Sequence, residues 1–111
     1  FFLKLNKKQR IMAISKIYPY SDEILQSSQI AKALGHPARM TIVKYLFRNY
    51  QAMNDTFQKL TTLHKSTISK HVKELIHANL IYSDYKDFAG NYYLKQEAAH
   101  LIEMLVQEIN Q

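Results

Sequence analysis

The stretch HKSTISKHVKEL, residues 64–75, combines regularly spaced aliphatic residues with hydroxyl and basic side chains. On a helix, which turns by about 100° per residue, Ile68, Val72 and Leu75 fall on one side and form an apolar stripe. The opposite side carries serines, lysines and a single glutamate. The pattern therefore predicts a helix over about 65–78 that buries one face and presents the other to an anionic partner.

The polar face of this helix has the composition of a surface that reads DNA. A solvated helix face more often mixes acids with bases, because Glu–Lys pairs four residues apart are mildly stabilising. Short hydroxyl side chains can approach base edges and phosphates closely, while lysines add charge attraction and can donate to guanine. A plain solvated face is the alternative, and the composition of this helix alone does not decide between the two.

Two further helices are predicted before this one. Ser21 is suited to cap a helix over about 22–34, whose first turn is acidic. Pro37 suits the first turn of a central helix over about 37–49. Apolar residues lie on nearly every side of the central helix, so we expect it to be buried almost all round. These residues are Met40, Ile42, Val43, Leu46 and Phe47.

The segments on either side of the polar helix complete a recognisable order. After a polar link, Asp55 is expected to cap a short helix that ends near Thr62. Downstream, the β-branched and aromatic residues of 80–86 and 92–94 predict two strands joined by a turn. A short helix, a turn, a longer helix and a hairpin follow one another in a winged helix-turn-helix. The predicted fold class is therefore mainly α with a small β-hairpin, a winged helix-turn-helix.

The last segment, about 96–110, has more apolar surface than a peripheral helix of a small domain needs. On a monomer this surface would leave a patch exposed to water. A second copy of the chain would cover it by pairing through this helix and the one at about 22–34, so we expect a homodimer. The residues expected at the interface are Ile24, Leu101, Leu105, Val106 and Ile109.

Length and composition limit the class of protein. With 111 residues, 47% of them hydrophobic, the chain is long enough for one domain with a single core. It has two glycines and no phosphate-loop motif, and the lack of cysteine removes disulfides and thiolate ligands. The absence of cysteine fits a reducing cytosol, so a cytoplasmic location is expected. The apolar runs are far shorter than the ~20 residues that cross a bilayer, so no membrane partner is expected.

The net charge of +6 is unevenly distributed. Residues 1–20 hold five bases and no acid, residues 21–80 hold eight bases and four acids, and residues 81–111 hold two bases and five acids. A basic front and an acidic tail favour a polyanionic partner. We predict a basic, helix-forming segment at 1–20 and a winged-helix domain with terminal dimerisation helices at 21–111.

Three motifs resemble one known family. AKALGHPARMTIVKYL (31–46), KLTTLHKSTISKHVKELIHANLI (59–81) and GNYYL (90–94) are similar to a helix start, the recognition helix and the return strand of ArsR-family winged helix-turn-helix repressors. The resemblance implies a homodimeric DNA-binding repressor whose first and last helices form the dimer interface. It also implies that one set of side chains lies in or beside the major groove. This set is Lys65, Ser66, Thr67, Ser69, Lys70 and His71.

Two further lysines are predicted DNA contacts. Lys73 lies on the same outer face of the helix, and Lys86 lies in the wing, which also contains Asp84 and Asp87 where many relatives are more basic. His64 occupies the position where the family often has a capping serine, and histidine is a poor cap.

Other kinds of site find little support in the sequence. The cysteine pair through which many relatives sense metals is absent, and His100 with Glu103 would supply only half of the family's carboxylate–histidine site. No nucleophile or paired carboxylate lies in register with the scattered histidines, so no enzyme, metal or cofactor is expected.

The remaining ring side chains favour packing roles. Tyr45, Phe47 and Tyr93 are expected in the core rather than in a ligand site. His71, beside the apolar stripe, fits a packing role and a phosphate contact equally well.

The sequence thus predicts a cytoplasmic, homodimeric transcriptional regulator that reads double-stranded DNA in the major groove with its helix at about 65–78, with repression the expected mode. The alternative is a winged-helix protein-interaction module whose basic face is incidental. The effector and the operator cannot be predicted from the sequence.

Overall fold

The computed structural model describes residues 4–7, 9, 19–84 and 90–111. Its helices and strands are α2 (Asp22–Leu34), α3 (Pro37–Asn49), β1 (Gln51–Ala52), α4 (Asn54–Thr61), α5 (Lys65–His77), β2 (Ile81–Ser83), β3 (Tyr92–Leu94) and α6 (Gln96–Asn110). The winged helix-turn-helix is confirmed, with the predicted order of helices and hairpin, whereas β1 was not predicted and lies in what the sequence indicated as a polar link. The helix predicted within residues 1–20 lies mostly outside the described residues.

Two helices begin where the sequence indicated. The hydroxyl of Ser21 caps α2 by accepting a hydrogen bond from the backbone N–H of Ile24 at 3.2 Å. The start of α3 combines Pro37 in its first turn with a cap from His36, whose Nδ1 accepts from the backbone N–H of Ala38 at 3.0 Å. The ends of both helices are therefore set by local sequence.

The predicted cap of the short helix was wrong. α4 begins at Asn54 after Met53, which makes no side-chain capping bond, and Asp55 lies inside the first turn. The negative charge of Asp55 still complements the positive end of the helix dipole there.

The hydrophobic core lies between α3, α5 and the sheet. The largest fully buried side chains come from every element except β1 and α6. They are Tyr92, Phe57, Ile30, Ile42, Leu46, Ile68, Leu75, Leu80, Ile81 and Val72. The rings of Phe57 and Tyr92 approach with centroids 5.8 Å apart, which joins the short helix to the sheet.

The expectation that α3 is buried almost all round was wrong. Ile42, Val43 and Leu46 are buried, but Met40 is 51% exposed and Phe47 is 44% exposed. The neighbours of α3 are α2, α4, α5, β1 and β3, and they leave one face of the helix open to solvent.

The other two aromatic residues predicted for the core lie at its margin. Tyr45 is partly buried against the core. Tyr93 is partly exposed and stacks on Tyr82 with ring centroids 5.2 Å apart.

The sheet has three antiparallel strands in the order β1–β3–β2. The hairpin of β2 and β3 was predicted, although its first strand is shorter than expected and residues 85–89 are not described. Asp84 holds the base of the wing, because its carboxylate accepts from the Tyr93 hydroxyl at 3.1 Å and from the Asn91 backbone N–H at 3.0 Å.

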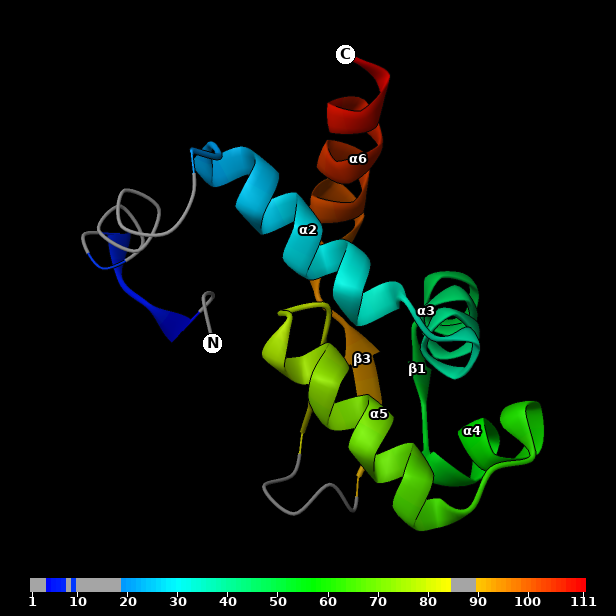
Figure 1. Ribbon diagram of the computed structural model, residues 1–111. Coiled ribbons are helices and arrows are strands. Elements are labelled where there is room, and N and C mark those ends of the chain that lie inside the picture. Colours follow the sequence, from blue (N-terminus) through cyan, green and yellow to red (C-terminus); the bar gives the residue numbers. More distant parts are fainter. Residues whose placement is uncertain (1–3, 8, 10–18, 85–89) are drawn as a thin grey trace.

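The elements separate into two ends of the molecule. Figure 1 shows α2 and α6 crossing at one end, with α4 and the start of α5 at the other. α2 packs extensively on α6, and α4 packs on α5. The helix-turn-helix and the terminal helices therefore form different surfaces of one domain.

The turn between α4 and α5 contains a strained residue. Thr62 has φ 59°, in the left-handed region, and its backbone N–H donates to the carbonyl of Gln58 at 2.8 Å. A β-branched residue is rare in this conformation, which costs roughly 1–2 kcal/mol without glycine. The preceding Thr61 is helical, and its hydroxyl donates to the carbonyl of Phe57 at 2.7 Å.

Replacing Thr62 with glycine should stabilise the protein. Glycine removes the steric cost of the positive φ but adds freedom to the unfolded chain, so we expect Thr62→Gly to raise the free energy of unfolding by about 0.5–1 kcal/mol. Thr61→Gly is the matched control and should lower it by about 1 kcal/mol. Urea unfolding of both variants checks the pair. A destabilised Thr62→Gly variant would show that the turn is not strained.

Candidate nucleic-acid interface

α5 begins with an unusual cap. His64 precedes the helix, and its Nδ1 accepts from the backbone N–H of Ser66 at 3.4 Å and lies 3.2 Å from the Ser66 hydroxyl. A histidine thus takes the capping role, in which Nδ1 is the acceptor and carries no proton. The helix starts at Lys65, which places this lysine in the first turn of the second helix of the helix-turn-helix.

The apolar stripe of α5 fixes how the helix is turned. Ile68, Val72 and Leu75 are all 0% exposed. Burying one such side chain stabilises the fold by about 1.5–3 kcal/mol, so a rotation of α5 that exposed the stripe would be strongly unfavourable. The outward direction of the polar residues follows from this burial.

The predicted contact residues of α5 lie on the side left open by this packing. Lys65, Ser66, Lys70 and Lys73 are exposed, while Thr67, Ser69 and His71 are partly exposed. The Ser69 hydroxyl donates to the carbonyl of Lys65 at 3.1 Å, so it can offer a partner only its lone pairs. Lys86 of the wing lies outside the described residues.

His71 lies at the edge of this face, against α3. Its ring centroid is 4.3 Å from that of His36, with the rings tilted by 45°. Burial lowers the pKa of His71 below its usual value, and the neighbouring His36 and Arg39 lower it further, while Glu74 raises it. Both roles considered for His71 remain compatible with this position, since the ring packs on α3 and stays partly open.

Sequence reasoning missed the contribution of α3 to this region. Arg39 is partly exposed, yet its Nε is buried and has no hydrogen-bond partner among the described residues. His36 and Arg39 belong to the HPAR stretch at the start of α3, which marked only a helix start in the sequence. Their approach to His71 depends on tertiary packing and leaves no sequence signal.

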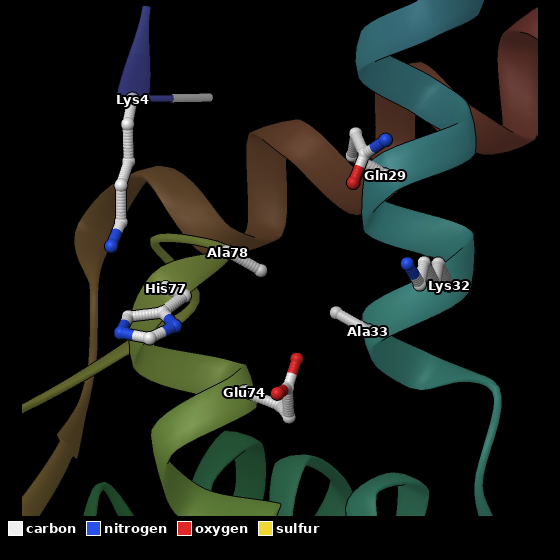
Figure 2. A pocket seen from close by; sticks show the side chains of 7 residues that line it. All are labelled: Lys4, Gln29, Lys32, Ala33, Glu74, His77 and Ala78. Carbon is white, nitrogen blue, oxygen red and sulfur yellow. The ribbon is translucent and has the colours of Figure 1, made fainter. Parts of the chain in front are cut away.

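A surface pocket of about 200 Å³ lies between α2 and the last turns of α5 (Figure 2). Its lining residues are Lys4, Gln29, Lys32, Ala33, Glu74, His77 and Ala78. In Figure 2 the Glu74 carboxylate and the His77 imidazole reach it from α5, opposite Lys32 and Gln29 of α2. The lining has mixed charge and the pocket is small, so it does not suit an extended polyanion.

Neither a metal-binding group of side chains nor a membrane-spanning helix is found in the described part of the chain. His100 and Glu103 are both exposed on α6, and residues 4–7, 9, 19–84 and 90–111 contain no group of three or more side chains that could hold a metal ion. No helix within the same residues is both long and apolar enough to cross a membrane.

The predicted dimer residues divide into two groups. Leu101 and Leu105 are partly buried against the core of their own chain. Ile24, Val106 and Ile109 are 39%, 51% and 74% exposed. The open apolar surface of α2 and α6 is therefore narrower than the sequence predicted.

The architecture and the position of α5 define a winged helix-turn-helix, and solved structures share it. A crystal structure of an ArsR-family transcriptional regulator matches with a TM-score of 0.67 and 19% identity, covering 82% of this chain and 93% of that one. HlyU from Vibrio cholerae matches with a TM-score of 0.64 and 20% identity, covering 83% of this chain and 100% of its own. The transcriptional repressor BigR from Xylella fastidiosa matches with a TM-score of 0.59 and 12% identity, covering 95% of each chain.

The resemblance drawn from the sequence motifs is thus confirmed at the level of the fold. No protein-family model and no curated protein matches the sequence. At identities of 12–20% the structural likeness establishes the shared architecture.

The titration of His71 tests the contact with α3. NMR of the imidazole should give a pKa below the usual histidine value of about 6.5, because the ring is partly buried beside His36 and Arg39. His36→Asn should raise this pKa while keeping a capping side chain. His77→Asn is the control and should leave it unchanged.

The same contact predicts how stability depends on pH. The folded pKa of His71 is the lower one, so the unfolded chain binds more protons in acid. The contribution of His71 to the free energy of unfolding should be complete above about pH 6.5 and should be lost as the pH falls through its folded pKa. A folded pKa equal to or above 6.5 would contradict the contact.

Proposed function

We propose that this protein is a cytoplasmic, sequence-specific DNA-binding transcriptional regulator that acts as a homodimer and represses by occupying its operator. The observation that supports the proposal most directly is the two-sided character of α5. Three fully buried aliphatic side chains hold one face in the core, and the open face carries lysines and hydroxyls. The structures that share the fold are of regulators, one of them described as a repressor, which supports the same function.

Within this proposal the side chains of α5 have different roles. Lys70 lies centrally on the open face, where it would donate to a guanine edge or neutralise a phosphate. Ser66 and Thr67 in the first turn would approach base edges or the backbone closely. Lys65 and Lys73, near the two ends of the face, would contact phosphates and set the register of the helix in the groove. Lys86 would add a contact from the wing.

The exposed apolar residues of α2 and α6 support the proposed homodimer. Ile24, Val106 and Ile109 are open on the monomer, and a second copy would cover them. Two-fold pairing there would present two α5 helices to successive major grooves, roughly 34–36 Å apart, and would require an inverted-repeat operator.

A winged-helix module that binds another protein is the second candidate. The open apolar side of α3, with Met40 and Phe47 about half exposed, favours it. Binding to random duplex DNA at two salt concentrations separates the candidates. Phosphate contacts give an affinity that falls steeply with salt, and a protein-binding module lacks this behaviour.

Removing the central lysine should weaken DNA binding. Against a duplex selected from a random pool, Lys70→Ala should lose about 1–3 kcal/mol of binding free energy if Lys70 reads a base. Lys44→Ala is the control, because Lys44 is exposed on α3. Fluorescence anisotropy measures both. Equal affinities of Lys70→Ala and the wild type would refute the assignment of α5 as the reader.

Charging the open surface of α6 should separate the dimer. Val106→Glu places a carboxylate in the proposed interface, so sedimentation should show monomers, and operator affinity should fall although no DNA contact has changed. Met40→Glu is the matched control, since both side chains are 51% exposed. A wild type that is monomeric at micromolar concentration would overturn the dimer.

A further inference from the structure

Three basic side chains meet where the start of α3 packs on α5. His36 caps α3, Arg39 lies in its first turn, and His71 comes from the middle of α5. The rings of His36 and His71 have centroids 4.3 Å apart, and the charge of Arg39 acts on His71. We name these residues the HRH cluster. The acidic group that acts on His71 is Glu74, one turn further along α5.

The HRH cluster has unused hydrogen-bonding capacity. Nε of Arg39 is buried without a partner among the described residues. A buried donor without an acceptor is unfavourable by about 1–3 kcal/mol, and native proteins rarely leave one unless a water or ion supplies the acceptor. Nδ1 of His36 is occupied as the cap of α3, which leaves its other ring nitrogen as a possible donor.

The basic groups of the cluster disfavour one another's positive charge when no anion is bound. A proton on His71 is disfavoured by partial burial and by His36 and Arg39. Among the described residues, the elements that pack on α5 add no other titratable group to those acting on His71, which are His36, Arg39 and Glu74. An oxyanion would accept from the guanidinium, would favour the charged imidazole, and would lie near the positive end of the α3 dipole.

The position of the cluster indicates the source of the oxyanion. His71 follows Lys70 directly and lies one turn after Thr67, so the cluster borders the open face of α5. We infer that His36, Arg39 and His71 form a phosphate-binding site that holds a backbone phosphate of the DNA duplex read by α5. The inference rests on the proposed function and adds a phosphate contact from the start of α3, outside α5.

Salt dependence tests the role of Arg39. Arg39→Gln should lower affinity for the selected duplex roughly threefold to tenfold and reduce the slope of log affinity against log salt by about 0.9, the value for one lost phosphate contact. Arg48→Gln, at the exposed far end of the same helix, should leave the slope unchanged. Arg39→Lys should restore most of the slope, because it keeps the charge. Thermal unfolding confirms that each variant is folded.

Proton uptake tests the role of His71. The phosphate favours the imidazolium, so binding should take up a proton and wild-type affinity should rise roughly threefold to tenfold from pH 7.5 to 5.5. His71→Gln should remove most of this rise, whereas His77→Gln should keep it. NMR should show the pKa of His71 raised by the duplex and little changed by millimolar inorganic phosphate. A comparable rise with inorganic phosphate would point to a free anion as the occupant and contradict the DNA assignment.

The failures of the two proposals can be told apart. Suppose that Lys70→Ala weakens binding, while Arg39→Gln has the salt dependence of the wild type and His71→Gln has its pH dependence. The cluster is then only a packing contact, and the proposed function stands. If the wild type shows no salt-dependent duplex binding at all, both the proposed function and the phosphate site are refuted.

Discussion

The burial of one stripe of α5 is the constraint on which the rest of the structure depends. Ile68, Val72 and Leu75 are completely enclosed by α3, α4, α2 and the sheet. With each contributing about 1.5–3 kcal/mol, the stripe allows one rotation of the helix about its axis. Lysines and hydroxyls that have two or three residues between them in the sequence, such as Ser66, Lys70 and Lys73, therefore face the same way. The chemistry of the outer surface is a consequence of the packing of the inner one.

The two ends of the fold carry different surfaces. α2 and α6 cross at the end away from α4, and they expose the apolar residues for which a second copy is the proposed partner (Figure 1). α3 connects the two ends, because it packs on both α2 and α5, and His36 and Arg39 at its start approach His71 of α5. α2 contacts α5 both directly and through α3, so the two ends belong to one packed unit.

Much of the fold could be predicted from the sequence because its signals are local. Helical periodicity identified α5, and Ser21 and Pro37 marked helix starts through capping and fixed backbone geometry. β1 was missed because two residues carry no periodicity, and its pairing with β3 is a long-range contact. The exposure of Met40 and Phe47 depends on which sides of α3 its neighbours leave open. For the same reason the meeting of His36 and Arg39 with His71 could be found only in three dimensions.

The most direct test of the account is an NMR titration of the isotopically labelled protein with its selected operator duplex. If α5 reads DNA, the largest amide shift changes should fall on residues 65–73, with smaller changes at the start of α3. The amides of 96–110 should change little, because they lie at the opposite end of the domain. Changes concentrated on α6 or on the exposed side of α3, with α5 unaffected, would contradict the central claim.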